Sequence, residues 1–379
     1  MKYYNNMGKH IIVAVFNLML FVCPVISQNS EQQLHIKEFE NQLVKDVSKD
    51  NTGSISGAII INGKIVWSRS YWLTNPLIKI YADTSTIYRI ASISKTFTAF
   101  LMMQMIEKGY FKLDDPIEKY LPEIKGLIGY SDSTLITFRH LASHTSGLIP
   151  EPKLKNAADG PIEDWENKIL LSIPTTSFQA KPGMEYSYSN IGYGILGLAI
   201  SRATNKPFIR LVNDNIFGPL NMKNSFYIVP VSDTIRLSLG VGTYSDNKDI
   251  KTPYREHKGR GYKVPNGGIY TTPNDLAKFV IALLGTSDKK IINYESRKLM
   301  QTICTPNDSR NGYGLGLNIS TTNDDLKIIG HSGSIAGYSS YFCFDIKNGN
   351  AVILLRNYNA GKTNLELSST ILLEKLAKR

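Results

Sequence analysis

The sequence has few cysteines and little compositional bias. Only three of its 379 residues are cysteine, too few for a small domain held together by disulfide bonds. Hydrophobic residues make up 42% of the chain and charged residues 20%, so collagen-like and intrinsically disordered proteins are excluded. The length allows two domains or one large α/β unit. Whether Cys304 and Cys343 pair is left open, because sequence alone does not bring two thiols together.

Long apolar runs are absent except near the N-terminus. Lysines precede an apolar stretch at residues 11–22, which Asn17 interrupts and Pro24 follows. The stretch is shorter than the about 20 apolar residues that span a bilayer, and it has the organisation of a secretory signal peptide. We therefore expect residues 1–27 to be a signal peptide and residues 28–379 to form a mature domain without a membrane span. This predicts a periplasmic or secreted protein.

Basic residues outnumber acidic ones, 43 to 32, for a formal net charge of +11. This balance fits attraction to anionic polymers or membrane surfaces, but the charges are dispersed along the chain. The densest basic run, residues 255–263, is interleaved with glycine and is typical of a solvated loop. No nucleic-acid-binding motif accompanies it, so nucleic acid is not an expected partner.

Hydrophobic spacing predicts helices and strands in a distinctive order. Asn62-Gly63 is a strong hairpin signal between two of the strands. We expect helices at 31–49, 92–108, 191–200, 276–284 and 362–378, and strands at 55–61, 64–69, 314–319, 326–329, 338–345 and 351–356. Strands near both ends and helices between them predict an α+β fold, an αβ sandwich. Its antiparallel sheet is built from both termini and flanked by helices, with a mainly helical subdomain inserted at about 110–265.

The first chemical signal is the sequence Ser92-Ile-Ser-Lys95. A serine and a lysine three residues apart share one face of a helix, so the amine can reach the hydroxyl. The helix start also favours negative charge beside Ser92, and burial among the following phenylalanines and methionines would lower the pKa of the lysine. Other Ser-x-x-Lys sequences, at 245–248 and 287–290, lie in polar strings that we expect at the surface.

Two further motifs supply possible partners. Tyr188-Ser-Asn190 precedes an apolar helix; a phenol near a lysine can act as a general base, and a carboxamide can bind a substrate amide. The alternative is a packed tyrosine and a helix-capping asparagine. His331-Ser-Gly333 is expected between two strands, where a strand edge could present an open backbone to substrate.

In this order, the three motifs resemble those of the penicillin-recognising serine hydrolases. The family includes class C β-lactamases, D-alanyl-D-alanine carboxypeptidases, D-aminopeptidases and related esterases. Supporting similarity occurs at residues 88–91, 141–148, 267–272, 313–316 and 330–338. The resemblance covers residues 50–358 and implies the β-lactamase/transpeptidase-like fold.

The resemblance implies roles for individual residues. Ser92 would be the acylated nucleophile, activated by Lys95 and Tyr188. Asn190 would contact the substrate amide. The third motif, His331 and Gly333 with the following Ser334, would line the substrate site, and the backbone N–H groups of Ser92 and Ser334 would form the oxyanion hole. Water would then hydrolyse the acyl-enzyme.

The third motif departs from the class C pattern, which usually has lysine at the position of His331. A histidine is mostly neutral at pH 7 and offers no fixed charge to a substrate carboxylate. The histidine form resembles the esterase and D-aminopeptidase branches, so we expect an ester, an amide or a D-amino-acid peptide, possibly one derived from peptidoglycan. The alternatives are a true β-lactamase, a D-alanyl-D-alanine carboxypeptidase, or a catalytically silent binder of cell-wall peptides.

Other chemistries have little support. The pair His140 and His144 has a spacing that zinc can use, but the residues between them lack the acid of a metalloprotease helix, so we expect structural roles and no metal. Gly-x-Ser-x-Gly, a phosphate-binding loop and a dinucleotide fingerprint are all missing from the sequence. No cofactor is expected.

Overall fold

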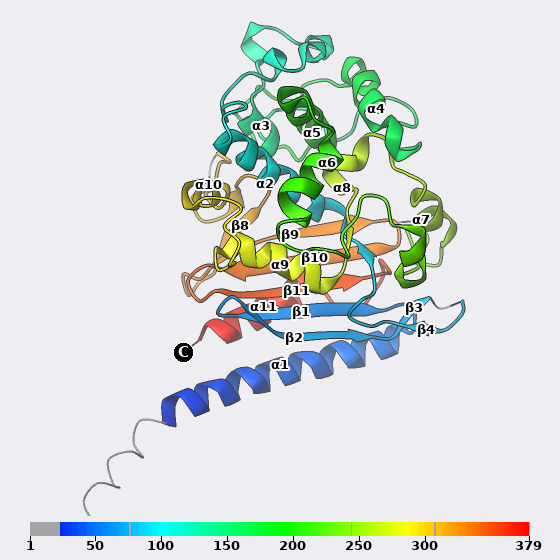
Figure 1. Ribbon diagram of the computed structural model, residues 1–379, viewed down its shortest axis with the longest axis vertical. Coiled ribbons are helices and arrows are strands. Elements are labelled where there is room, and N and C mark those ends of the chain that lie inside the picture. The colour runs from blue at the N-terminus through cyan, green and yellow to red at the C-terminus, as the bar shows by residue number, and fades with distance from the viewer. Residues whose placement is uncertain (1–22, 76, 244, 307, 379) are drawn as a thin grey trace, which may run out of the picture.

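The computed structural model describes residues 23–75, 77–243, 245–306 and 308–378, and its central feature is a seven-stranded antiparallel sheet (Figure 1). The strand order is β2 (Lys64–Tyr71), β1 (Ile55–Ile61), β11 (Asn350–Arg356), β10 (Tyr338–Asp345), β9 (Lys327–Ile335), β8 (Asn318–Thr321) and β7 (Gly312–Tyr313). The first two strands therefore pair with the last of the chain. This arrangement confirms the predicted α+β fold with a sheet built from both termini.

The hairpin between β1 and β2 follows directly from its turn residues. Asn62 has φ of 50° and Gly63 has φ of 73°, both in the left-handed region. Two successive residues with positive φ make the type I′ turn that matches strand twist, and Asn-Gly is the sequence that tolerates it best. The hairpin predicted from this dipeptide is confirmed.

Both faces of the sheet are buried, each under its own helices. The helices α1 (Cys23–Asp50) and α11 (Leu365–Ala377) cover one face, and α2 (Ser94–Glu107) and α9 (Pro273–Leu284) lie on the other (Figure 1). Alternate residues of a strand point to opposite faces. Accordingly, Ile59 packs with the α1 and α11 side, while Ala58 and Ile60 pack with the α2 and α9 side.

A mainly helical region occupies the chain between β5 (Tyr88–Arg89) and β6 (Tyr270–Thr271). It contains α3 (Phe138–Ala142), α4 (Trp165–Ser172), α5 (Asn190–Thr204), α6 (Phe208–Val212), α7 (Lys251–Glu256) and α8 (Val264–Gly267). Two further sheets have two strands each. One pairs β3 (Leu73–Asn75) with β4 (Ile80–Tyr81), and the other pairs β5 (Tyr88–Arg89) with β6 (Tyr270–Thr271). The remaining α-helix is α10 (Tyr294–Met300). The pairing of β5 with β6 places the chain just before Ser92 against the chain just before α9.

Several details differ from the sequence prediction or complete it. The strand predicted at 314–319 is not continuous, because β7 ends at Tyr313 and β8 begins at Asn318. Residues 331–333 lie inside β9 rather than between two strands, because β9 continues to Ile335 along β10. The helix α1 extends to the N-terminal side of residue 31 and includes Cys23, where the described residues begin; no proline or glycine interrupts residues 25–50. Cys304 and Cys343 are both free thiols.

The predicted signal peptide lies mainly outside the described residues, which begin at residue 23, and it stays a prediction. Within the described ranges, no helix combines the length and apolar character needed to cross a membrane.

Candidate active site

Ser92 lies in the 3-10 turn η1 (Ala91–Ile93), immediately before α2. The preceding residue, Ala91, has φ of 47°, a conformation that costs a residue other than glycine on the order of 1–3 kcal/mol. The Ile90 N–H donates to the Ile269 carbonyl at 3.1 Å and anchors the chain next to the turn. Because α2 follows at once, its unpaired N–H groups and positive dipole end favour negative charge near Ser92.

Lys95 points from the first turn of α2 toward Ser92. Its Nζ lies 3.1 Å from Ser92 Oγ, 2.7 Å from Asn190 Oδ1 and 3.2 Å from the carbonyl oxygen of Asn266. The side chain is fully buried. No carboxylate of the described residues forms an ion pair with it. The three oxygens within hydrogen-bonding distance of this amine are all neutral.

The electrostatic environment favours the neutral form of Lys95. Burial lowers its pKa well below the ordinary value, and the positive charges of Lys263 and Arg260 lower it further, while Glu151 acts in the opposite direction. A neutral amine 3.1 Å from the hydroxyl can accept the serine proton. This geometry gives Ser92 a base within hydrogen-bonding distance.

Tyr188 lies beside the same amine. Lys95 Nζ is 4.8 Å from the centre of the Tyr188 ring, so the predicted tyrosine and lysine are brought together. The tyrosine also packs on His144, with ring centres 4.2 Å apart. His144 Nδ1 accepts a hydrogen bond from the Ser189 N–H at 3.0 Å. His144 thus fixes both the ring of Tyr188 and the backbone that follows it.

Asn190 links Lys95 to a carboxylate. Its Oδ1 accepts from Lys95, and its Nδ2 donates to Glu151 Oε1 at 2.7 Å. Glu151 is held in turn by Lys263, 3.0 Å away, and by the hydroxyl of Tyr262. Because a carboxylate only accepts hydrogen bonds, Glu151 fixes which end of the amide faces Lys95.

His331 is engaged by the protein on both ring nitrogens. Its Nδ1 lies 2.6 Å from the carbonyl oxygen of Ser332 and therefore carries the proton, and its Nε2, 2.8 Å from Tyr313 Oη, accepts from that hydroxyl. Burial lowers the pKa of His331 from 6.5 to about 3. The ring is neutral at pH 7 and offers no positive charge to a substrate.

Gly333 allows β9 to approach the chain before the nucleophile. A Cβ at this position would lie 2.2 Å from the Ile90 carbonyl oxygen and 2.4 Å from Ser340 Oγ. Only glycine fits without displacing one of them. Ser334, the second oxyanion-hole residue predicted from the resemblance, follows in β9 with an exposed side chain, opposite Ser339 of β10. The strand β8 pairs with β9 only as far as Gly330, which leaves this side of β9 outside that ladder.

Five of the residues around the site were not predicted as part of it: Tyr313, Asn266, Glu151, Lys263 and His144. Three of them had a sequence signal, because they lie in or beside stretches that carried the family resemblance. Glu151 lies in a loop and Lys263 ends the short 3-10 helix η9 (Gly261–Lys263), and neither residue had such a signal. The pair His140 and His144 serves two different elements, since His140 Nδ1 accepts from the Thr137 N–H at the start of α3.

The other two Ser-x-x-Lys sequences lie elsewhere. Ser245 and Lys248 are exposed, as is Lys290, and Ser287 is partly so.

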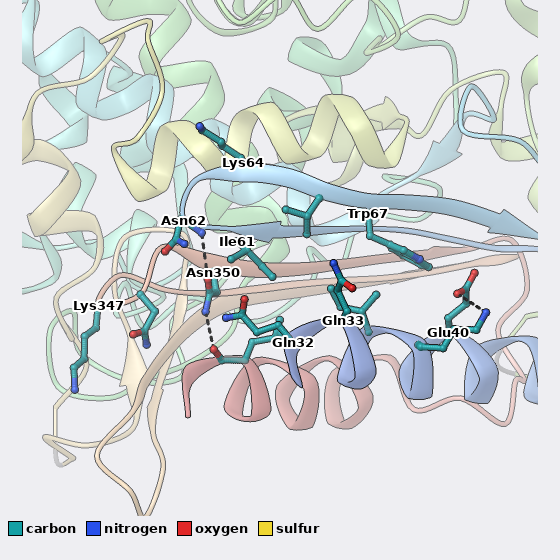
Figure 2. Close-up of a pocket in the computed structure, with 14 residues that line it drawn as sticks. Gln32, Gln33, Glu40, Ile61, Asn62, Lys64, Trp67, Lys347 and Asn350 are labelled. Carbon is teal, nitrogen blue, oxygen red and sulfur yellow. Dashed lines mark hydrogen bonds and ion pairs between the residues drawn. The ribbon is translucent and has the colours of Figure 1, made fainter. Parts of the chain in front are cut away.

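A cavity of about 1040 Å³ is also remote from Ser92; it lies between α1, the β1–β2 hairpin and the end of α11 (Figure 2). Its Asn350 side chain is used structurally, accepting from the Asn62 N–H and donating to the carbonyl of Leu376. The chemistry is therefore concentrated at the start of α2.

The sheet, the inserted helices and the serine–lysine pair at their junction define a protein of the β-lactamase/transpeptidase-like class. The chain belongs to the Beta-lactamase family, which matches residues 39–374.

Curated relatives include Beta-lactamase-like protein 4 of Dictyostelium discoideum, 29% identical over 91% of this chain. Protein flp of Staphylococcus aureus is 25% identical over 88% of it. The chain covers 64% of the length of each of these two relatives.

Solved structures agree with the fold. The beta-lactamase/D-alanine carboxypeptidase from Yersinia pestis, determined with citrate, is 26% identical with a TM-score of 0.70, over 89% of this chain and 99% of that one. The octameric penicillin-binding protein homologue from Pyrococcus abyssi superposes with a TM-score of 0.74 over 90% of this chain and 77% of that one. At 24% identity, this second likeness concerns the fold alone.

Proposed function

We propose that the protein is a serine hydrolase that works through an acyl-enzyme on Ser92. The observation that carries the proposal is the buried Lys95 amine, 3.1 Å from Ser92 Oγ and hydrogen-bonded to neutral oxygens. A lysine whose pKa is lowered in this way can act as a general base, whereas a structural lysine would usually be paired with a carboxylate. Membership of the Beta-lactamase family supports the same reaction class.

In this mechanism, Lys95 accepts the proton of Ser92 as Oγ attacks the substrate carbonyl carbon. Negative charge develops on the carbonyl oxygen, beside the N-terminus of α2 and the backbone N–H groups of Ser92 and Ser334. Tyr188, next to Lys95, shares the proton delivery to the leaving group. Water then attacks the acyl carbon and releases Ser92, which completes hydrolysis.

We propose an ester, an amide or a D-amino-acid peptide, including peptides derived from peptidoglycan, as substrate rather than a β-lactam. The support is the neutral state of His331, whose nitrogens are both used by the protein. A substrate carboxylate would find no cation at this position of β9. The proposal includes export to the periplasm or the medium, in agreement with the signal-like start of the sequence.

Intact-protein mass spectrometry tests the nucleophile. The protein is exposed to p-nitrophenyl acetate and, separately, to benzylpenicillin. We expect an acetyl adduct on the wild type, turnover of the ester, and neither in Ser92→Ala. The matched control is Ser245→Ala, which removes an exposed serine from another Ser-x-x-Lys sequence and should react as the wild type does. Ester turnover that survives in Ser92→Ala would refute the assignment. Rapid benzylpenicillin turnover would refute the substrate preference alone.

A further inference from the structure

A second cavity, of about 270 Å³, lies behind the segment that carries Asn266. Its walls come from β5, the 227–229 segment, the end of α7 and residues 257–270. The residues that matter for its chemistry are Arg89, Tyr227, Glu256, Arg260 and Tyr270. None of Ser92, Lys95 and Tyr188 lines it, so it is distinct from the catalytic site.

The floor of this cavity holds more positive than negative charge. Arg89 Nη1 and Arg260 Nε lie 3.0 Å and 3.1 Å from the same oxygen, Glu256 Oε2. The side chains of Arg89 and Arg260 are 2% and 15% exposed. Arg89 also has the faces of aromatic rings beside it, 5.7 Å from the centre of Tyr270. One carboxylate therefore serves two largely buried guanidinium groups, and an uncompensated buried charge is costly.

Two buried hydrogen-bond donors at the cavity also lack an acceptor among the described residues. Arg260 Nε is close to Glu256, but its N–H is not aligned for a hydrogen bond. The hydroxyl of Tyr227 is buried without a partner, and this residue is only 5% exposed. A buried donor without an acceptor costs about 1–3 kcal/mol. Both groups require the same kind of partner, an oxygen acceptor.

Neighbouring titratable groups do not cancel the charge. Burial, with the positive charge of Arg89, lowers the pKa of Arg260 to about 10, so Arg260 is still protonated at pH 7. Burial lowers the pKa of His257 to about 3. The two nitrogens of its neutral ring are hydrogen-bonded to the hydroxyls of Tyr270 and Tyr338. The other charged residues on the wall are Glu163, Lys258 and Lys263, of which Lys263 pairs with Glu151. The lining of this cavity therefore contains more basic than acidic side chains.

The rest of the lining is apolar. Ile162, Ile228 and Val264 contribute to it, and Ile228 is exposed by 59%. The volume is near the lower limit of ligand pockets, which suits a small molecule. We propose that this cavity binds a small carboxylate with a short apolar chain. Arg260 and Tyr227 donate hydrogen bonds to the carboxylate, and the chain lies against the isoleucines.

The cavity adjoins the catalytic site through one segment. A Cβ at Gly267 would lie 3.3 Å from Arg260 Nη1 and 3.9 Å from the carbonyl carbon of Ala91, the residue before Ser92. The preceding residue, Asn266, supplies a carbonyl oxygen to Lys95. The carboxylate can thus belong to a substrate that also reaches Ser92, or to a separate small molecule.

Isothermal titration of sodium hexanoate into the Ser92→Ala protein tests the site independently of catalysis. We expect saturable binding of hexanoate and none of 1-hexanol or hexylamine at the same concentrations. Arg260→Gln should raise the dissociation constant at least about 10-fold, and Tyr227→Phe several-fold, as expected for lost hydrogen bonds to a charged group. Arg255→Gln, at an exposed position of α7, is the control and should bind as the parent does.

Two results would overturn the proposal: hexanoate that does not saturate the Ser92→Ala protein, or equal affinity in parent and Arg260→Gln. If Arg260→Gln does not fold, Tyr227→Phe decides, because it removes only a hydroxyl. Wild-type kinetics with a p-nitrophenyl ester whose acyl chain carries a free carboxylate then separate the two sources. A hexanoate-dependent rise in KM at constant kcat indicates the substrate's own carboxylate, and an unchanged KM indicates a separate small molecule. Failure of Ser92 acylation would leave this binding assay unaffected.

Discussion

Gly333→Ala tests whether contact between β9 and the chain before Ser92 sets the catalytic geometry. The new Cβ would stand 2.2 Å from the Ile90 carbonyl oxygen, where ordinary contacts begin at 3.4 Å. Either the strand or the carbonyl must therefore move by about 1 Å. Since Ile90 is two residues before the nucleophile, we expect that movement to be transmitted to Ser92 and to the 3.1 Å contact with Lys95.

The expected magnitude follows from this displacement. A misplacement of about 1 Å at reacting groups lowers rates about 100-fold, and overpacking of a buried site costs about 1–3 kcal/mol of stability. We expect kcat/KM for p-nitrophenyl acetate to fall by about two orders of magnitude and the melting temperature to fall by several degrees. Adding Ser340→Ala removes the second clash, at 2.4 Å, and should restore only part of the loss, because the carbonyl contact persists.

The control is Gly126→Ala, where the nearest atom to a new Cβ is Ile173 Cγ2 at 3.6 Å. This variant should keep both activity and melting temperature. If Gly333→Ala had the kcat/KM and melting temperature of the wild type, the tight contact would have no role and the reasoning would be wrong.

Two further predictions concern charge. Glu151→Gln should shift the acidic limb of the pH profile of kcat/KM to lower pH, because the Glu151 carboxylate raises the pKa of Lys95 against the effect of burial. An unchanged acidic limb would mean that Glu151 does not influence the pKa of the catalytic base. Burial lowers the pKa of His257 and His331 from 6.5 to about 3, so below pH 6.5 the unfolded chain binds protons that the folded chain does not. Stability should fall by about 1.4 kcal/mol per pH unit for each histidine as the pH falls from 6.5 toward 3. Urea midpoints at pH 7 and pH 5 measure this, and equal midpoints would contradict it.

Local sequence patterns predicted much of the fold. Asn62-Gly63 specifies its own turn through two positive φ values, and Thr272 caps α9 by accepting from the Asp275 N–H three residues later. Ser92 and Lys95 meet because they are one helical turn apart. In each case the relevant atoms are within a few residues, so the sequence contains the geometry.

The parts of the site that the sequence did not predict depend on contacts between residues far apart in the chain. Glu151 reaches Asn190 and Lys263 from positions 39 and 112 residues away, and no local period encodes such a pairing. The same holds for Tyr313, which occupies Nε2 of His331 from the neighbouring part of the sheet. The sequence identified His331 as a departure from lysine, but only packing determines that both of its nitrogens are already used.

These contacts give the site an unequal charge distribution with a functional consequence. The β9 side, represented by His331, is neutral, whereas the side that carries Lys263 and Arg260 is positive. The same two cations lower the pKa of the Lys95 amine. A substrate anion bound on that side would weaken their effect and raise the pKa of Lys95, so tight anion binding and a strong base at neutral pH oppose each other. A neutral acyl group at Ser92, with any carboxylate held at a distance from Lys95, avoids this conflict.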